Sequence, residues 1–443
     1  MNTLFYNAKI VNEGKTFIGY IGICDNLIIA VGEGFPEKII SKFEKSVDLK
    51  GALLLPGIID DQVHFRDPGL THKADILTES TAAVAGGVTS FMDMPNTKPQ
   101  TITVDLLESK NRRASEVSLA NYAFYIGATN DNYEELLKVD FKKTPGIKLF
   151  LGASTGNMLV DNDNTLDKIF SLDALIAIHS EDEEIIRRNA SYFKSQFEEV
   201  PISCHSLIRS EDACYKSTFK AVERAKRLGT RLHVLHLSTA RELELFSIIP
   251  LSDKKITSEV CVHHLWFTDA DYIRLGSKIK WNPAIKTSFD RDALRNAVKT
   301  GQIDIVATDH APHLLEEKEG DALHAASGGP MVQHSLVTML ELVEQGVFTI
   351  EKVVDVMSHR PAELFRIEKR GYLREGYYAD LVILEKDSWT IHKENIFSKC
   401  GWSPLEGETL HYKVQQTYVN GQLVYDRGNF NCEHKGERLT FRQ

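Results

Sequence analysis

The sequence predicts an α/β protein: a (β/α)8 TIM-type barrel that carries a small β-sandwich domain built from both termini. Three observations predict this fold. Short β-rich segments occur at both ends, apolar runs alternate with amphipathic stretches between them, and polar residues follow most of those runs. Alternating strands and helices are typical of a parallel sheet, and about eight such strands close a barrel. We expect sandwich segments at residues 1–52 and 373–443, and the barrel at residues 53–372.

The two ends of the chain read as β-structure. Turn residues such as Asn12 and Gly14 separate the first segments, and Asn420-Gly421 is a strong signal for a two-residue hairpin. Because short β-rich segments separated by turn residues occur at both ends, we expect one small sheet domain assembled from the two ends. The β-rich segments are residues 4–11, 17–24, 27–31 and 46–49, and then 379–384, 414–419 and 422–425.

The middle of the chain reads as repeated βα units. A helix is expected at residues 77–85, where Gly86-Gly87 ends it, and another at residues 211–228, ended by Gly229. Residues 314–330 form the longest segment that we expect to be mobile. The strands expected in the barrel are residues 53–59, 88–92, 120–126, 147–151, 175–178, 232–235, 256–260 and 303–307.

The composition is that of a folded enzyme. The chain has 443 residues, of which 42% are apolar and 26% charged, so a disordered or fibrous protein is excluded. Its net charge of −10 argues against nucleic acid as the main partner. No apolar run approaches the roughly 20 residues that span a bilayer, and the first ten residues do not resemble a signal peptide. We expect a small-molecule substrate and no membrane partner.

The six cysteines indicate a reducing compartment. None of them belongs to a CxxC pair, so neither a disulfide framework nor a thiolate zinc site is expected. We therefore expect a cytoplasmic protein with reduced thiols. The cysteines are Cys24, Cys204, Cys214, Cys261, Cys400 and Cys432.

Polar residues stand where most of the apolar runs end, and the carboxyl ends of the strands carry the active site of such a barrel. Histidines and an aspartate that converge on one rim are a donor mixture suited to zinc or a similar divalent ion. These residues are Asp60, Gln62, His64 and Arg66 after the first run, Lys148 within the fourth, His179 after the fifth, His236 after the sixth, His263 and His264 after the seventh, and Asp309 and His310 after the eighth.

Each histidine also has a simpler interpretation, because a histidine is more often a hydrogen-bonded core or surface residue than a metal ligand. His179 and His236, however, each end an apolar strand, where an unpartnered polar side chain would be costly. Because Asp309 also follows an apolar run, the three residues together favour a metal site. The pair His263-His264 stays open, because adjacent strand residues point to opposite faces and at most one can face the site.

Lys148 lies between apolar residues in the segment GIKLFLG. Burial there would lower the pKa of its ammonium group and make the neutral amine available. A neutral amine can capture carbon dioxide as a carbamate, an anionic group able to bridge two metal ions. The alternative is a lysine at a strand end that extends to solvent. Beside the histidines, the carbamate is the interpretation that we prefer.

Taken together, these residues resemble the dihydroorotases, in the cyclic amidohydrolase branch of the amidohydrolase superfamily. The resemblance covers nearly the whole chain, and the ordered set of motifs is more specific than any one of them. The motifs are PGIIDDQVHFRDPG (56–69), MPNTKP (94–99), GIKLFLG (146–152), AIHSED (177–182), LHLST (235–239), WNPAIK (281–286), TDHAPH (308–313) and GWSPLEG (401–407).

The resemblance implies one or two zinc ions at the mouth of the barrel, and a carbon dioxide-derived carbamate on Lys148. An arginine fork suits a carboxylate, and side-chain amides can hydrogen-bond a cyclic imide. The implied metal ligands are His64, Lys148, His179, His236 and Asp309, and the implied substrate-binding residues are Arg66, Asn96, Asn282, His313, Gly328 and Gly329.

One residue departs from the family pattern. The family has HxH after the first strand, and Gln62 stands where the first histidine belongs. Glutamine is a weak, neutral oxygen ligand, so we expect Gln62 to be a weak or absent ligand of the more buried metal position. One zinc would be held tightly by Lys148, His179 and His236. The second would be partly occupied, or held mainly by His64 and Asp309.

The implied activity is the reversible, zinc-dependent hydrolysis of (S)-dihydroorotate to N-carbamoyl-L-aspartate in pyrimidine biosynthesis. Asp309 would be the catalytic general base that becomes the general acid. Two alternatives remain: another cyclic amidase (allantoinase, hydantoinase or dihydropyrimidinase), and a non-catalytic scaffold for aspartate transcarbamoylase. Asn96-Thr97 and the segment TDHAPH favour dihydroorotase. A homodimer and an association with aspartate transcarbamoylase are left open.

Overall fold

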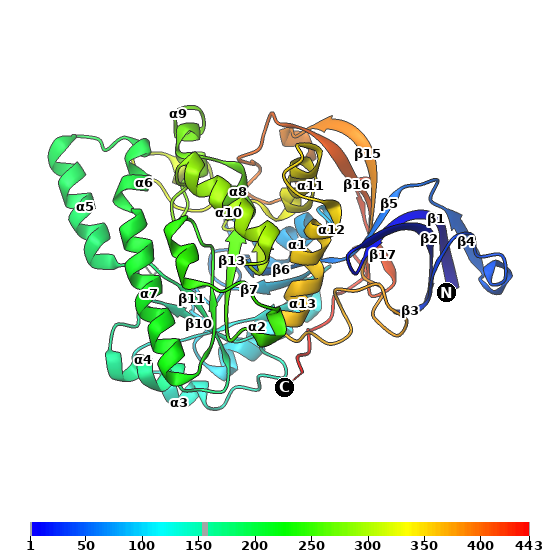
Figure 1. The fold of residues 1–443 in the computed structure, drawn as a ribbon, viewed down its shortest axis with the longest axis horizontal. Coiled ribbons are helices and arrows are strands. Elements are labelled where there is room, and N and C mark those ends of the chain that lie inside the picture. The colour runs from blue at the N-terminus through cyan, green and yellow to red at the C-terminus, as the bar shows by residue number, and fades with distance from the viewer. Residues whose placement is uncertain (1, 153–157, 443) are drawn as a thin grey trace.

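The structure is a computed structural model that describes residues 2–152 and 158–442. Its larger part is a parallel barrel surrounded by helices, and its smaller part is a sheet that contains strands from both ends of the chain (Figure 1). The predicted fold class, a (β/α)8 TIM-type barrel with a small β-sandwich domain built from both termini, is confirmed: the barrel is present, and a nine-stranded sheet combines strands from both ends.

Two hydrogen-bonded sheets make up the barrel, in the orders β6-β7-β8 and β14-β13-β12-β11-β10-β9. The segments β8 and β9 are one pass of the chain, interrupted at Tyr125. A parallel bridge between Val63 and His310 closes β6 against the segment that follows β14. The strands are β6 (Ile58–Val63), β7 (Val88–Asp93), β8 (Asn121–Phe124), β9 (Ile126–Gly127), β10 (Ile147–Phe150), β11 (Leu175–His179), β12 (Arg231–Val234), β13 (Ile256–Cys261) and β14 (Ile305–Ala307).

Local sequence signals define the ends of several helices. The side chains of Asp75 and Thr78 form a capping box at the start of α1, and Gly229 ends α7 at a φ of +72°. None of the helices in the described ranges is long and apolar enough to cross a membrane. The helices are α1 (Ile76–Ala85), α2 (Val104–Val117), α3 (Tyr133–Leu136), α4 (Asp163–Phe170), α5 (Glu183–Gln196), α6 (His205–Ile208), α7 (Glu211–Leu228), α8 (Val262–Trp266), α9 (Tyr272–Leu275), α10 (Ser288–Thr300), α11 (Ser335–Glu344), α12 (Ile350–Val354) and α13 (Arg360–Leu364).

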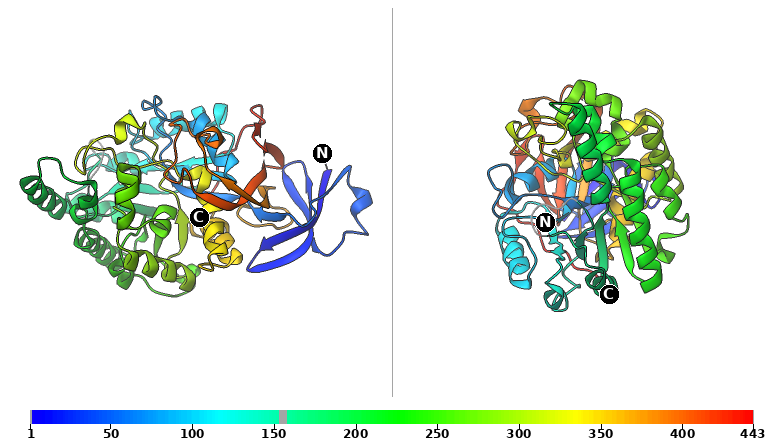
Figure 2. Two further views of the ribbon diagram at one scale, coloured as in Figure 1. Left: turned by 90° about the horizontal axis from the view of Figure 1, so that it is seen from above. Right: turned by 90° about the vertical axis from the view of Figure 1, so that its left-hand side faces the viewer.

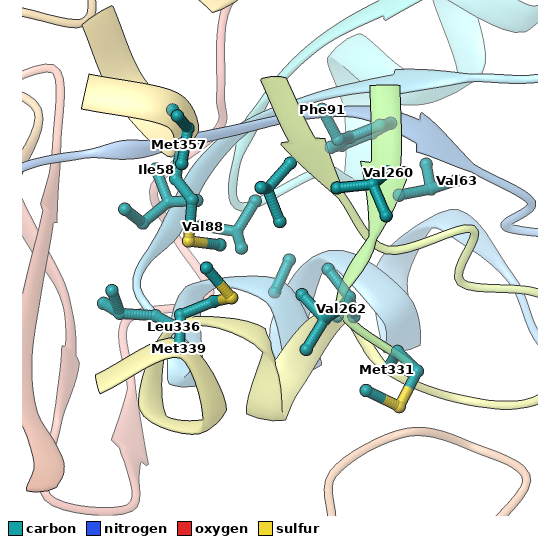
Figure 3. Packing of buried hydrophobic residues seen from close by; sticks show 14 of the residues in the cluster. Ile58, Val63, Val88, Phe91, Val260, Val262, Met331, Leu336, Met339 and Met357 are labelled. Atoms are coloured by element: carbon teal, nitrogen blue, oxygen red, sulfur yellow. The ribbon is translucent and has the colours of Figure 1, made fainter. Parts of the chain in front are cut away.

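The main hydrophobic core lies between the barrel and its helices. Ile58 and Val88, on the first two barrel strands, pack with Leu336 and Met339 of α11 (Figure 3). Met357, in the π-helical turn between α12 and α13, belongs to the same cluster. These side chains are at most 1% exposed. Their burial stabilises the barrel strands, and the polar residues lie at the ends of these strands.

The terminal sheet has nine strands and joins both ends of the chain. Its order is β18-β17-β16-β15-β5-β1-β2-β3, and β4 pairs with β1. Residues from both halves of the sheet, such as Phe5 and Ile383, pack in one separate cluster. The strands are β1 (Asn2–Asn12), β2 (Lys15–Cys24), β3 (Leu27–Glu33), β4 (Lys45–Asp48), β5 (Leu53–Pro56), β15 (Leu381–Thr390), β16 (Thr409–Val419), β17 (Gln422–Asp426) and β18 (Asn429–Phe430).

The strand expected at residues 53–59 is divided in the structure. Residues Leu53–Pro56 (β5) pair with β1 and β15 in the terminal sheet, whereas the barrel begins at Ile58. Gly57 lies between the two strands. A Cβ at this position would lie 2.0 Å from Thr89 Oγ1, so only glycine allows the chain to pass from sheet to barrel so close to β7.

The C-terminal tail returns to the barrel. Leu439 N donates to Tyr122 O, and Tyr122 N donates to Glu437 O, so the tail runs beside β8. Leu439 and Phe441 are at most 5% exposed and pack with barrel residues that include Tyr125. The C-terminus accordingly lies against the barrel, at a distance from the N-terminus (Figure 2).

Candidate active site and metal centre

The carboxyl ends of the barrel strands open into a cavity of about 860 Å³. Its size is typical of a small-molecule site. Gly329 is not part of the lining; it lies behind Gly328, and a Cβ there would lie 2.9 Å from the Trp281 ring. The expected site residues that line the cavity are Gln62, His64, Arg66, Asn96, Lys148, His179, His236, Asn282, Asp309, His313 and Gly328.

Strand ends place the expected ligands around the cavity. His179 is the last residue of β11, and His236 and Asp309 each follow a strand by two residues. His236 has a φ of +41°, Asp309 of +44° and Arg66 of +66°. Such backbone costs about 1–3 kcal/mol per residue and is concentrated at functional sites. The surrounding barrel therefore holds these three side chains in orientations that an unconstrained chain would avoid.

Four of the expected ligands form two pairs. His64 Nε2 lies 3.1 Å from Asp309 Oδ1, and His179 Nδ1 lies 3.0 Å from His236 Nε2. Burial lowers the pKa of both His179 and His236, which favours the neutral imidazole, the form that binds a metal. The pairing brings together nitrogen and oxygen donors that suit a divalent ion such as zinc.

Neighbouring polar groups orient these histidines. His64 Nδ1 lies 2.8 Å from Asn96 Oδ1, and His179 Nε2 lies 3.0 Å from Glu181 Oε2. Burial alone would raise the pKa of Glu181, but Arg209 and His179 hold it down to about 2. Glu181 is therefore an anion that fixes the tautomer and the ring orientation of His179. The sequence analysis did not identify Glu181, although it follows His179 in the segment AIHSED.

Lys148 lies in the wall of the cavity and is 1% exposed. Its Nζ lies 4.7 Å from the centre of the Phe150 ring. Burial lowers the pKa of Lys148 to about 7, so a large fraction of the amine is neutral at physiological pH. This is the condition that carbamate formation requires. His236 Nδ1 is buried and has no hydrogen-bond partner among the described residues, so the donor set at the mouth fits a metal centre.

Gln62 contacts the site as a hydrogen-bond donor. Its Nε2 donates to Asp309 Oδ1 over 3.2 Å, and its Oε1 lies 3.8 Å from Cys261 Sγ. The amide oxygen, which is the only atom of the side chain that could bind a metal, is thus directed towards Cys261. In this arrangement Gln62 orients Asp309.

Two further residues of the cavity lining, Arg66 and Lys73, carry positive charge. Arg66 Nη2 lies 3.1 Å from His313 Nε2, and Lys73 Nζ lies 3.1 Å from His313 Nδ1. Arg66 is 8% exposed, and none of the ion pairs among the described residues includes it. Nearby, Asn282 Oδ1 is buried and has no hydrogen-bond partner in the described part of the chain. Lys73 is a cavity residue that the sequence analysis did not identify.

The segment at residues 314–330 is anchored, although the sequence indicated mobility. Lys318 is 2% exposed, and its Nζ donates to Lys280 O, Ala326 O and Gly328 O over 2.7–3.2 Å. Gly328 has a φ of +120°, and a Cβ there would lie 2.6 Å from Ala311 O. Glycine is therefore required where this segment contacts the cavity.

His263 and His264 follow the seventh barrel strand, as expected, but they lie on the short helix α8. His263 stacks on Trp281 with ring centres 4.3 Å apart, and His264 Nε2 lies 3.2 Å from Pro283 O. Neither residue lines the cavity. The opposite-face argument does not apply to them, because the chain turns into a helix immediately after Cys261.

Two further groups of potential ligands lie outside the cavity. Within the described residues, groups of three or more His, Cys or acidic side chains with ligand atoms within 4.8 Å of one another are Cys261–His263–His264 and Asp61–His233–Glu259. The expected ligands at the mouth of the cavity are not among these groups; His64 with Asp309 and His179 with His236 form two pairs instead.

Comparisons with known proteins agree with the geometry. The model of the Amidohydrolase family matches residues 53–424. The chain is 34% identical over 435 residues to a dihydroorotase of Pyrococcus abyssi. The alignment covers 98% of this chain and 97% of that protein. It is 30% identical to an allantoinase of Bacillus velezensis, over 95% of this chain and 93% of the relative.

A solved structure extends the comparison to the fold. The L-hydantoinase (dihydropyrimidinase) from Arthrobacter aurescens superimposes with a TM-score of 0.93 at 26% identity, and the match covers 99% of each chain. The family match covers most of the chain, and the relatives span nearly all of it. The chain therefore belongs to the amidohydrolase family and is a metal-dependent hydrolase of cyclic amides.

Proposed function

We propose that this enzyme is a dihydroorotase that catalyses the reversible hydrolysis of (S)-dihydroorotate to N-carbamoyl-L-aspartate, in cytoplasmic pyrimidine (UMP) biosynthesis. The dihydroorotase relatives at 32–34% identity support this proposal, and so do the free cysteines. The observation that carries it is Arg66, a buried guanidinium in the cavity wall without an acidic partner among the described residues.

A buried guanidinium without a counter-ion is costly unless a ligand supplies the negative charge. Dihydroorotate has a carboxylate on its ring, whereas allantoin and hydantoin do not. The planar fork of Arg66 can bind that carboxylate with two hydrogen bonds. His313 Nε2, 3.1 Å from Arg66 Nη2, holds the guanidinium in place.

The amide ring would be recognised by polar groups around the same cavity. We assign Asn96 and Asn282 to the ring nitrogen and oxygen atoms, because both line the cavity and Asn282 Oδ1 has no partner within the described chain. The backbone at Gly328 would close over the ring, since the absence of a side chain there leaves room beside Ala311. Gly329 would act by supporting Gly328 against Trp281.

We propose that zinc is the metal and that carbamylated Lys148 holds it together with His179 and His236. His64 and Asp309 would hold a second, weaker ion. When bound, such an ion lowers the pKa of water towards about 7 and polarises the carbonyl that is attacked. Gln62 is assigned to the orientation of Asp309, not to the metal, because its Nε2 faces that carboxylate.

Asp309 is the proposed general base and general acid. Both of its contacts at the mouth use Oδ1, which lies 3.1 Å from His64 Nε2 and 3.2 Å from Gln62 Nε2. We assign proton transfer to Oδ2, which takes a proton from the attacking water and passes it to the departing ring nitrogen. The two contacts fix the carboxylate, so one group can reach both positions in turn.

The test is a substrate panel with a charge-matched pair of variants. Wild-type enzyme should hydrolyse dihydroorotate with a kcat/KM well above those for dihydrouracil, allantoin and hydantoin. Arg66→Met should lower kcat/KM for dihydroorotate by about 100-fold or more, and that for dihydrouracil, which lacks the carboxylate, by less than about 10-fold. Lys98→Met, which removes an exposed lysine from the same cavity wall, is the control.

The second candidate is another cyclic amidase. The allantoinase of Bacillus velezensis and the L-hydantoinase of Arthrobacter aurescens are the relatives that favour it. If the wild-type enzyme turns over allantoin or hydantoin faster than dihydroorotate, and Arg66→Met leaves that rate unchanged, the dihydroorotase assignment is wrong. Gel filtration, alone and with aspartate transcarbamoylase, tests the homodimer and the association that we propose as partners.

A further inference from the structure

We propose that the barrel interior holds a second, structurally separate divalent-cation site, formed by Asp61, His233 and Glu259. These residues come from the strands β6, β12 and β13, and all three are 0% exposed. None of them lines the active-site cavity. The proposal does not depend on which cyclic amide the enzyme hydrolyses.

The polar atoms of this group lack ordinary partners. His233 Nδ1 lies 2.9 Å from Thr257 Oγ1, which leaves Nε2 directed at the two carboxylates. Among the described residues, His233 Nε2, both carboxylate oxygens of Asp61 and Glu259 Oε2 have no hydrogen-bond partner. A single unpartnered polar atom in a dry interior costs about 1–3 kcal/mol. Four of them in one place indicate that something else binds there.

The distances fit an ion. His233 Nε2 lies 3.6 Å from Asp61 Oδ2 and 3.5 Å from Glu259 Oε2. Nitrogen and oxygen ligands at about 2.0–2.2 Å from a tetrahedral zinc ion are separated by about 3.3–3.6 Å. The observed separations fall at the upper end of that range. One imidazole and two carboxylates form a donor set that suits zinc and similar divalent ions.

A direct ion pair between His233 and the carboxylates of Asp61 and Glu259 explains the same distances less well. An imidazolium that donated to a carboxylate would lie about 2.7–2.9 Å from it, which is shorter than either separation observed. No lysine or arginine in the described chain forms an ion pair with Asp61 or Glu259. Without a cation, the two buried carboxylates would interact with the imidazole only over about 3.5 Å. A cation between them would bind one atom of each side chain.

The cation would support the active site through Glu259. Glu259 Oε1 accepts a hydrogen bond from His236 N over 3.2 Å, and Cys261 Sγ lies 3.5 Å from the same oxygen. Glu259 therefore uses one oxygen for the strained backbone of His236 and directs the other at His233. An ion bound there would fix Glu259, and through it the position of His236. Because the group is fully buried, we expect the ion to enter during folding.

The test counts and locates metal in the purified holoenzyme. Zinc per chain is measured by mass spectrometry after dialysis against a mild chelator, for wild type, Asp61→Asn, His179→Gln and the double variant. Asp61→Asn should lose about one equivalent of zinc per chain, His179→Gln should lose the mouth zinc, and the two losses should add. Circular dichroism checks that each variant is folded.

A zinc-edge anomalous difference map of wild-type crystals locates the ion without any variant. A peak within about 2.2 Å of Asp61, His233 and Glu259 supports the site. Full occupancy at the mouth without a peak between these residues would overturn it, and so would a folded Asp61→Asn variant with wild-type zinc content. Protons, not a cation, would then balance the buried carboxylates.

Discussion

At the scale of single residues, Asp309 is the side chain on which the proposed chemistry depends most. Its carboxylate accepts from Gln62 and contacts His64, and it is 6% exposed. Asp309→Asn keeps the shape but cannot take up a proton. We expect kcat to fall by at least about 100-fold while the protein stays folded. Steady-state kinetics and circular dichroism are the measurements; a variant that keeps most of its rate would remove Asp309 from proton transfer.

Gln62 allows a gain-of-ligand prediction. A histidine at this position could replace the neutral amide by an imidazole nitrogen, which binds zinc far better than an amide oxygen does. We expect Gln62→His to raise the zinc content at the mouth by up to one equivalent per chain. Gln62→Asn, which keeps the amide, is the matched control. Unchanged zinc content in Gln62→His would show that the second position is not limited by this residue.

The expected metal ligands at the mouth of the cavity could be predicted from the sequence because each stands at or near the end of an apolar run, as His179 and Asp309 do. The group of Asp61, His233 and Glu259 could not be predicted from the sequence. These residues lie within strands whose apolar neighbours suggest an ordinary barrel wall, and only the three-dimensional register brings them together. The adjacent acidic residues Asp60-Asp61 were the one available signal.

At the scale of elements, helix ends were the most predictable features. The helix expected at residues 211–228 is found as α7 with the same bounds, because Gly229 adopts the left-handed conformation that ends it. The division of residues 53–59 into β5 and β6 was not predictable. A continuous apolar run carries no mark of where one sheet ends and another begins, and the close approach of Gly57 to Thr89 is a tertiary feature.

The anchored segment at residues 314–330 can be tested through Lys318. Its ammonium group donates to three backbone carbonyls, and Lys318→Met would remove these three hydrogen bonds, whereas Lys280 O would still accept from Gly328 N. We expect a local destabilisation of about 3 kcal/mol. Limited proteolysis should cut the variant faster within this segment, and KM should rise because Gly328 lines the cavity. Lys299→Met, an exposed lysine on α10, is the control; equal cleavage of the two variants would contradict the anchoring role.

At the scale of the whole molecule, the two ends of the chain tie the terminal sheet to the barrel. The strand β5 lies between β1 and β15, so the sheet is continuous across both termini. The sequence predicted this sheet because β-rich segments occur at both ends. It did not predict that residues 436–442 leave the sheet and pair with the barrel, since the two alternating apolar residues of so short a segment do not show which sheet it joins.

We expect the returning tail, residues 436–442, to stabilise the barrel without taking part in catalysis. Leu439 and Phe441 are buried against the barrel, whereas Thr440 between them is exposed, as expected for alternation along an extended strand. Leu439→Ala and Phe441→Ala should each lower the free energy of unfolding by about 3 kcal/mol, whereas Thr440→Ala should change it by less than about 1 kcal/mol. Urea unfolding followed by tryptophan fluorescence measures these values. Because no tail residue lines the cavity, kcat of the folded variants should stay within about twofold of wild type. If the two core substitutions were as mild as the control, the tail would only lie on the barrel surface and contribute nothing to its closure.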